Sequence, residues 1–447
     1  MLIKLKIKNF LSFRDATEFS LVAGDGKGGE HHVAVPRKGL RLLPAAVVYG
    51  GNAAGKSNLF KAVEFLRNFV VGGTRLPEDP IPVRPFRLDG KSREAPSEFA
   101  VRALIGKDIY EYSFKIDRKA VKKETLKRNA ETLFSRDAEG KVTLSPQTGN
   151  DRSRSLLRFV AQNTRPNQLF LTASVLQNQA AFREVYEWFR TKIVLVSPES
   201  VAIQLPELIG NSEDYKRKMT RAVASLDTGI ADLRLRRVPL ESIPVQKEII
   251  EKYLARMRNG QTMSLRCERP GDDLRFLLTM KDGEGAAYKL VGTHRADHDG
   301  MEDFDMDEES AGTRRILDLL PAFLDLAEPK SDRVYFVDEI DRCLHPLLVQ
   351  KLMEDYLDAR DATRRAQIVF TTHDLLLMRD GLFRVDEMWA AERDADGAST
   401  LIPFYDFLEA EDDPALLDSY LDGRLGGIPR AESTIGADAM RRAEDGE

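Results

Sequence analysis

The feature that most constrains this chain is a glycine-rich run, Gly50-Gly51-Asn52-Ala53-Ala54-Gly55-Lys56-Ser57. It follows an apolar stretch at residues 45–49 and precedes residues 57–71, where apolar side chains recur at helical spacing. A strand, a glycine-rich turn and a helix in this order form a phosphate-binding unit of α/β proteins. Backbone N–H groups and the positive helix end can surround a phosphate, Lys56 can neutralise its oxygens, and Ser57 can bind Mg²⁺. A chance glycine-rich turn is the alternative.

Composition indicates an ordinary globular protein. The 447 residues are 42% hydrophobic and 31% charged, with a formal net charge of -5. This balance argues against a wholly basic nucleic-acid coat. Two cysteines, Cys267 and Cys343, form neither a disulfide framework nor a CxxC pair, so we expect a reducing cytoplasm. We find no signal peptide and no apolar run long enough to cross a bilayer, and expect no membrane partner.

Two periodicities alternate along the rest of the chain. The spacing predicts strands at residues 1–13, 18–23, 97–105, 109–116 and 192–196, of which the third and fourth form a hairpin. Helices are predicted at 155–162 and 182–189, and a loop at 137–154. The middle, 211–259, is predicted to be mostly helical, as a short helical hairpin. Strands return from residue 274, and 333–337 and 367–371 read as buried parallel strands.

These elements predict an α/β fold with a mixed or parallel central sheet flanked by helices, an antiparallel β lobe and a short helical insertion. We divide the chain into an N-terminal part with the glycine-rich loop and the β lobe, a mainly helical insertion, a C-terminal part and a polar tail. Their respective ranges are 1–135, 136–270, 271–430 and 431–447.

Two acids end the predicted strand at residues 333–337. Asp338 can hold Mg²⁺ through water, and Glu339 can orient or deprotonate an attacking water molecule. A strand followed by surface acids is common, so this pair gains weight only from the glycine-rich loop upstream.

Ser310 and Gly312 lie just before an amphipathic helix, in the run ESAGTRR that begins at Glu309. A small hydroxyl side chain, a glycine and a helix N-terminus can bind an anion. The alternative is an ordinary serine N-cap, which the same residue would satisfy.

His373 follows the buried strand 367–371. The carboxyl ends of strands gather at the ligand edge of open α/β sheets, so His373 could donate a hydrogen bond to a terminal phosphate. A capping or core histidine is the alternative.

Taken in order, the loop, the serine-glycine corner, the Asp-Glu strand and the histidine resemble ABC-type ATPases. Further runs narrow the resemblance to the phage-defence and repair branch: NFLSF at Asn9, FSLVA at Phe19, ESAGTRR at Glu309, DEIDRCLHP at Asp338 and TTHD at Thr371. That branch includes OLD ATPases, RecF-like proteins and the ATPase subunit of the phage anti-restriction-induced system. The resemblance is weak between residues 120 and 270.

The resemblance implies Mg²⁺-dependent ATP hydrolysis by two heads that sandwich ATP, as a homodimer or higher oligomer. Lys56, Glu339 and His373 would be catalytic, and Ser57 and Asp338 would bind magnesium. The ATP-binding residues implied are Gly50, Asn52, Ala53, Ala54, Gly55, Lys56, Ser57 and Asn58, joined in trans by Ser310 and Gly312 of the other head.

Two positions depart from the family pattern or leave it open. His345 stands where transporters usually have an aspartate that bridges the heads, although Leu344-His345-Pro346 is typical of the defence and repair branch. Gln177 and Gln179 are candidates for the glutamine that senses magnesium, with ordinary surface residues as the alternative.

The sequence after His373 is short and acidic, and we expect it to hold no nuclease domain. A nuclease or toxin effector would then be a separate chain. Two basic groups, Lys4, Lys6 and Lys8, and residues 118–128, leave nucleic-acid binding open. Two other functions are compatible with the sequence: a nucleotide-gated scaffold with little turnover, and a repair ATPase that clamps DNA ends.

Overall fold

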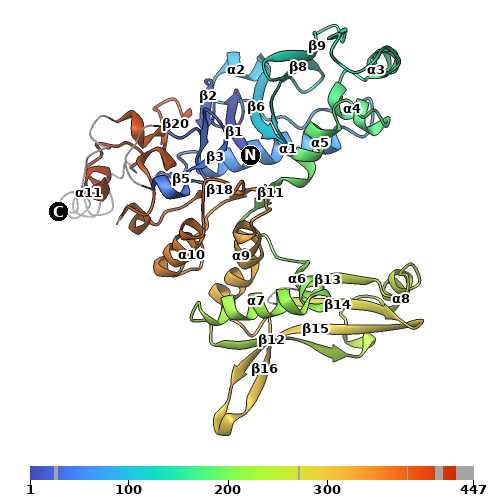
Figure 1. Cartoon of the computed structure of the whole chain (residues 1–447), viewed down its shortest axis with the longest axis vertical. Helices are drawn as coiled ribbons and strands as arrows, with labels where there is room; N and C mark the ends of the chain where they lie inside the picture. The colour runs from blue at the N-terminus through green and yellow to red at the C-terminus, as the bar shows by residue number, and fades with distance from the viewer. Residues whose placement is uncertain (25–28, 270–271, 380, 408–415, 429–447) are drawn as a thin grey trace, which may run out of the picture. The chain divides into compact units, whose positions relative to one another are not determined.

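The computed structural model of the chain describes residues 1–24, 29–269, 272–379, 381–407 and 416–428. It divides into two compact units (Figure 1). Unit 1 comprises Met1–Glu30, Leu40–Ile193 and Val369–Glu447, and unit 2 comprises His31–Gly39 and Val194–Ile368. The predicted polar tail, 431–447, and the acidic segment 409–413 lie outside the described residues.

Unit 1 contains a seven-stranded antiparallel sheet in the order β10-β9-β8-β7-β6-β1-β2. Ile3, Leu5 and Ile7 of β1 are buried, while the intervening lysines are at least partly exposed, as the alternation predicts. The predicted hairpin is confirmed as β6 and β7. The strands are β1 (Leu2–Lys8), β2 (Thr17–Ser20), β6 (Ser97–Ile105), β7 (Asp108–Ile116), β8 (Val121–Arg128), β9 (Glu131–Arg136) and β10 (Val142–Leu144).

A second, mixed sheet follows the order β18-β5-β19-β20 in unit 1. Strand β5 (Ala45–Tyr49) is buried at every residue and pairs in parallel with β19 (Met388–Arg393), which pairs antiparallel with β20 (Ser399–Pro403). Strand β18 comprises Gln367–Thr371, and the next residue, Thr372, donates a hydrogen bond from its backbone N to Val48 O. The strand that precedes the glycine-rich loop is therefore held on both sides.

Helix α1 (Lys56–Gly72) buries the predicted apolar face, Leu59, Phe60, Val63, Leu66 and Phe69. Aromatic rings attach it to the antiparallel sheet, with Phe65 and Phe99 centroids 5.2 Å apart and Phe69 and Phe114 centroids 5.8 Å apart. The other helices of unit 1 are α2 (Gly90–Glu94), α3 (Asp151–Asn163), α4 (Phe170–Leu176), α5 (Arg183–Thr191) and α11 (Leu416–Leu421). The helices predicted near residues 155 and 182 are thus confirmed, whereas the predicted loop 137–154 includes β10 and the start of α3.

Unit 2 carries the strand order β11-β17-β18, and it includes Val194–Val196 of β11 (Ile193–Val196) and the first two residues, Gln367 and Ile368, of β18. All four residues of β17 (Val334–Val337) are buried, as predicted for this apolar run. Helix α9 (Ala311–Ala327) buries Ile316, Leu319, Leu320 and Phe323 and contacts α10 (Pro346–Asp358) and α7 (Glu213–Ala224). The short strand β3 (Ala34–Arg37) belongs to this unit, and β4 (Leu40–Leu42) to unit 1.

The predicted helical hairpin at residues 211–259 is wrong, because a long strand separates two helices. That strand, β12 (Ile230–Val238), pairs with β15 (Glu284–Arg295), and its Ile230 and Leu233 are buried. The lobe has the order β12-β15-β14-β13, with β16 also paired to β15, and Figure 1 shows α7 lying across it. Its remaining elements are α6 (Leu205–Asn211), α8 (Lys247–Leu254), β13 (Thr262–Arg269), β14 (Asp272–Lys281) and β16 (Met301–Asp305).

The chain is therefore an α/β protein with a mixed sheet and two antiparallel β lobes, one in each unit. Among the helices that the structure describes, none is both long enough and apolar enough to cross a membrane.

Candidate functional site

The glycine-rich run forms a tight loop between β5 and the first turn of α1. Three of its residues have positive φ: Gly50 at 149°, Ala53 at 63° and Gly55 at 113°. Only glycine adopts such angles without strain, and space is also limiting. A Cβ at Gly50 would stand 2.6 Å from the Ala391 carbonyl oxygen, and one at Gly55 would stand 2.4 Å from Ser399 Oγ. The two glycines therefore fix the loop's path against β19 and β20.

Lys56 is the first residue of α1 and is 95% buried, being only 5% exposed. Its Nζ donates to Gly50 O at 2.7 Å and Gly51 O at 3.2 Å, so the ammonium group folds back over the loop. The N-cap of α1, Gly55, supplies no side chain, which leaves the helix N-terminus open to an anion from the loop side. An uncapped helix N-terminus beside a lysine is a combination that fits a nucleotide phosphate.

Ser57 and Asp338 bear the oxygens that we predict bind magnesium. Ser57 is half-buried in the first turn of α1, and Asp338 is 5% exposed directly after β17. Hydroxyl, carboxylate and phosphate oxygens suit Mg²⁺, so these residue types fit the ion. Among the described residues, no cluster of three or more His, Cys, Asp and Glu could hold a metal by itself.

His373 lies in unit 1 at the carboxyl end of β18, next to the strand that leads into the loop. Thr372 N bonds to Val48 O, and Val48 is two residues before Gly50. Thr372 Oγ1 accepts a hydrogen bond from Asp374 N, and Asp374 Oδ1 accepts one from Leu376 N. This turn leaves His373 exposed between two buried residues. The fold therefore brings the predicted histidine and the glycine-rich loop to one end of one sheet.

The acid pair lies in unit 2. Asp338 N donates to Val196 O at 2.9 Å, which extends the pairing of β17 with β11 by one residue. Glu339, the next residue, is half-buried and has φ 49°. A non-glycine residue in this left-handed region is uncommon and often marks a functional site.

Ser310 is the N-cap of α9, and its Oγ accepts a hydrogen bond from Thr313 N at 3.0 Å. The ordinary capping role is thus real, and the residue is exposed as well. Gly312 faces the segment after the acid pair, where a Cβ would stand 2.9 Å from Cys343 O. Both residues of the serine-glycine corner therefore also have structural roles within unit 2.

His345 has a local task at the position that departs from the transporter pattern. It is the N-cap of α10, with Nδ1 accepting a hydrogen bond from Leu347 N at 3.3 Å and Pro346 at the first helical turn. Capping explains Leu344-His345-Pro346 without a contact between heads.

Residues 45–379 match the family model described as "AAA domain, putative AbiEii toxin, Type IV TA system". The chain belongs to this AAA-domain family. Among solved structures, the SMC head domain from Thermotoga maritima is 12% identical, with a TM-score of 0.39, and the alignment covers 90% of this chain and 98% of that one. The SMC head bound to the C-winged helix domain of ScpA is 13% identical, also with a TM-score of 0.39, over 90% and 97%. The curated proteins contain no match.

Several contacts of the loop in this AAA-domain protein were not assigned from the sequence. Asn58 Nδ2 donates to Ser12 Oγ at 2.7 Å, and Ser399 N donates to Ser12 O at 2.7 Å. Gly51 N donates to Gly427 O at 2.8 Å, which fastens a distant C-terminal segment to the loop. The NFLSF run gave a signal for Ser12, whereas nothing in the sequence pointed to Gly427.

Gln177, the C-cap of α4, is exposed, and Gln179, two residues further on, is half-buried. The same helix is tied to the far end of α1, where Thr172 Oγ1 donates to Val70 O at 2.7 Å. A helix rises 1.5 Å per residue, so Val70 lies about 20 Å along α1 from Lys56. This attachment does not favour a magnesium-sensing role for either glutamine, and that role stays a prediction.

Proposed function

We propose that this protein binds ATP with Mg²⁺ at the Gly50–Ser57 loop and hydrolyses it. The loop geometry carries the proposal: two glycines pressed against neighbouring strands, an open helix N-terminus and a lysine folded over the loop carbonyls. Membership of the AAA-domain family agrees with it.

Each side chain then has a task in phosphoryl transfer. Amides of the loop hold the β-phosphate, and Lys56 moves from its carbonyl partners to phosphate oxygens. Glu339 orients the attacking water and accepts its proton while the bond between the γ-phosphorus and the bridging oxygen breaks. His373 donates a hydrogen bond to the γ-phosphate. Mg²⁺, when bound, would neutralise the phosphate oxygens.

We further propose that two copies close head to head around ATP. Ser310 is exposed at the N-terminus of α9, a 17-residue helix. The tip of this helix is therefore accessible to a phosphate presented by a second copy. ATP would stabilise the pair because the γ-phosphate bridges both copies, and hydrolysis would remove that bridge. Ser310 and Gly312 would act in trans.

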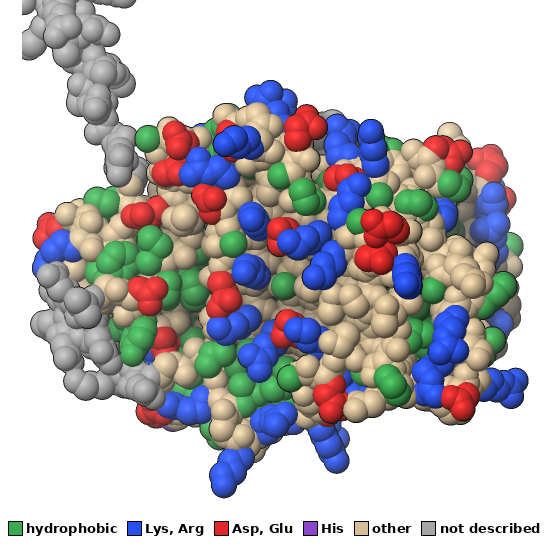
Figure 2. All heavy atoms as spheres, turned by 90° about the horizontal axis from the view of Figure 1, so that it is seen from above, with side chains coloured by type: hydrophobic (Ala, Val, Ile, Leu, Met, Phe, Trp, Pro, Cys, Tyr) green, Lys and Arg blue, Asp and Glu red, His purple; other side chains and the backbone are tan. Residues whose placement is uncertain are grey.

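The partner that this cycle controls is proposed to be a separate protein effector in antiviral defence, in keeping with the toxin named in the family description. DNA is the less favoured partner. Figure 2 shows basic side chains interspersed with acidic ones on one face. The two basic groups include ion pairs on the antiparallel sheet, from Lys4 to Glu18 at 2.6 Å and from Lys122 to Asp117 at 2.9 Å. Neutralised lysines attract phosphate backbones weakly.

The test is ATP binding and phosphate release by purified variants. Lys56→Ala should lose ATP binding, whereas Lys61→Ala, an exposed lysine on the same helix, should not. Glu339→Gln should bind ATP normally but hydrolyse it at least about a hundredfold more slowly, the usual contribution of a general base. Hydrolysis at the wild-type rate by Glu339→Gln would contradict the assigned role.

A further inference from the structure

A second arginine of the ESAGTRR run, Arg315, connects α9 with the acid pair. It is 5% exposed, and its guanidinium donates to three backbone carbonyls: Ser197 O at 3.0 Å, Glu339 O at 3.3 Å and Asp338 O at 3.4 Å. All four residues belong to unit 2. Arg315 therefore joins the helix that begins at Ser310 to the loop after β11 and to the segment after β17.

Arg315 is a buried arginine whose side-chain hydrogen bonds go to backbone carbonyls. Burial lowers its pKa against the opposing charge of Asp318, yet an arginine stays protonated at physiological pH. Its side-chain bonds go to carbonyl dipoles rather than to a carboxylate. The guanidinium therefore holds backbone groups of the acid pair in place through directional hydrogen bonds.

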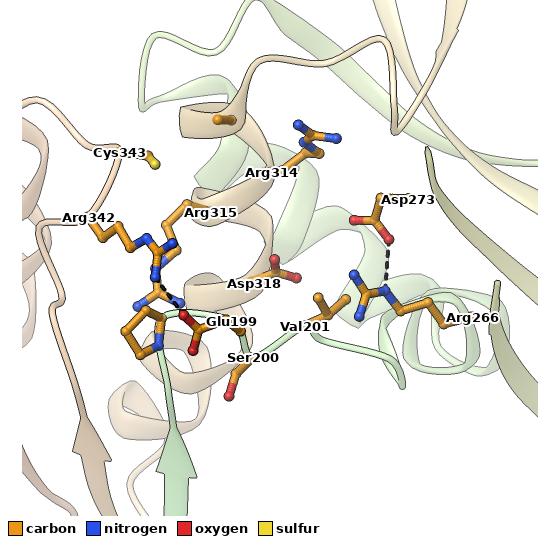
Figure 3. A pocket seen from close by; sticks show the side chains of 12 residues that line it. Glu199, Ser200, Val201, Arg266, Asp273, Arg314, Arg315, Asp318, Arg342 and Cys343 are labelled. Atoms are coloured by element: carbon orange, nitrogen blue, oxygen red, sulfur yellow. Dashed lines mark hydrogen bonds and ion pairs between the residues drawn. The ribbon is translucent and has the colours of Figure 1, made fainter. Parts of the chain in front are cut away.

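Arg314 provides the contrast on the same helix. Figure 3 shows the two side chains leaving α9 on opposite sides, Arg314 toward Asp273 and Arg315 toward Arg342 and Glu199. Both line one cavity of about 410 Å³. Within the part of the chain that the structure describes, the Arg314 side chain makes no hydrogen bond or ion pair, so the contact with the acid pair is specific to Arg315.

The conformation of Glu339 needs such a support. Its φ of 49° lies in the left-handed region, which costs a non-glycine residue about 1 kcal/mol and persists only where neighbours hold it. Arg315 Nη2 binds the carbonyls immediately before and after the Glu339 N–Cα bond. These are the groups whose placement decides where the Glu339 carboxylate points.

We propose that Arg315 is a positioning residue that fixes the Glu339 carboxylate and makes its position depend on α9. The proposal rests on the proposed ATPase function. Arg315 is five residues after Ser310, within the first turns of a stiff helix. A shift of the helix tip when it meets a phosphate therefore reaches the Glu339 carbonyl directly. Nucleotide capture at Ser310 and water activation at Glu339 would then be coupled within one unit.

The test compares Arg315→Met and Arg315→Lys with Arg342→Met. Arg342 lines the same cavity but pairs with exposed Glu199 at 2.7 Å, and its backbone bond to Glu339 O survives the substitution. We expect kcat to fall about a hundredfold in Arg315→Met, since a displacement of about 1 Å can cost this much, with KM and the ATP Kd within about threefold of wild type. Arg315→Lys keeps the charge but lacks the planar guanidinium, and its kcat should fall about tenfold. The kcat of Arg342→Met should stay within about threefold of wild type.

A double-mutant cycle separates positioning from other causes. In the Glu339→Gln background, Arg315→Met should reduce the residual rate less than about threefold, because the carboxylate it positions is gone. A full hundredfold loss in that background, wild-type kcat in Arg315→Met, or equal losses in Arg315→Met and Arg342→Met would overturn the proposal. If Arg315→Met does not fold, the same cycle with Arg315→Lys decides.

Absence of ATPase activity in the wild type would instead refute the proposed function. In that case hydrogen exchange decides: amides 339–343 should exchange faster in Arg315→Met than in Arg342→Met, and equal exchange would refute the positioning role.

Discussion

Among single residues, Gly312 of the serine-glycine corner has a packing role within unit 2, apart from any contact with a second copy. Gly312 lies on α9 with the Cys343 carbonyl where a side chain would be. A glycine inside a helix normally costs about 0.5–1 kcal/mol relative to alanine. Its presence here is therefore explained by the close approach of the segment that follows the acid pair.

Gly312→Ala should destabilise the protein without nucleotide by about 1–3 kcal/mol, because the added Cβ at 2.9 Å must displace a backbone oxygen. Gly72→Ala is the matched control, since Gly72 ends α1 with nothing within 4 Å of its would-be Cβ. It should be neutral or slightly stabilising. Urea unfolding of both variants measures this, and equal stabilities would show that Gly312 has no packing role.

Prediction from the sequence was strongest where one residue type meets one physical demand. Gly50 and Gly55 could be placed in a tight loop because few residue types adopt their backbone angles, while the ATP-binding roles of these glycines and of Lys56 stay predictions. It was weakest where one residue can satisfy two demands. Ser310 caps its helix and is exposed as well, and His345 proved to be a cap. Arg315 escaped notice because its partners are backbone carbonyls, which leave no mark on the sequence.

At the scale of elements, the antiparallel lobe of unit 2 is joined to α9 by a buried group of charges. Arg275 on β14 is 1% exposed and pairs with Asp273 at 2.6 Å and with Asp318 of α9 at 2.8 Å. Burial disfavours ionisation of Asp273, but hydrogen bonds from Arg275 and Arg266 outweigh it and hold the pKa of Asp273 below its usual value. Strand β14 and helix α9 thus depend on each other.

Asp273→Asn should cost about 3 kcal/mol of unfolding free energy at pH 7, because it leaves part of a buried charge uncompensated. Because the folded pKa is depressed, this stabilisation is present above the usual carboxyl pKa of 3.8 and is lost as the pH falls through the folded value. The matched control is Asp214→Asn, which removes an exposed pair with Lys218 on α7 and should leave unfolding unchanged. Equal unfolding curves for the two variants would contradict the prediction.

Elements were predictable where one periodicity dominated. The alternation in β1, the apolar runs of β5 and β17 and the helical face of α1 all have the predicted burial. The strand β12 was missed because its residues IADLRLRRV carry four charges and bury few side chains. Its pairing with β15, more than 45 residues later, supplies the backbone hydrogen bonds that decide its conformation.

At the scale of the whole molecule, the predicted motifs are divided between the units. Unit 1 holds the loop with Lys56 and the exposed His373, whereas unit 2 holds the acid pair and the tip of α9 with Ser310. The order of these motifs can be seen in the sequence. Their division between the two units cannot, because it depends on contacts between distant segments. An α/β fold could be inferred, while the second β lobe could not.

We propose that ATP is held between two copies of the chain, each of which presents the tip of α9 to the other. The most direct test is the mass of Glu339→Gln in solution by analytical ultracentrifugation, with and without MgATP. MgATP should increase the association state to paired heads, and adding Lys56→Ala or replacing Ser310 by arginine should abolish the increase. An unchanged mass while ATP is demonstrably bound would contradict it.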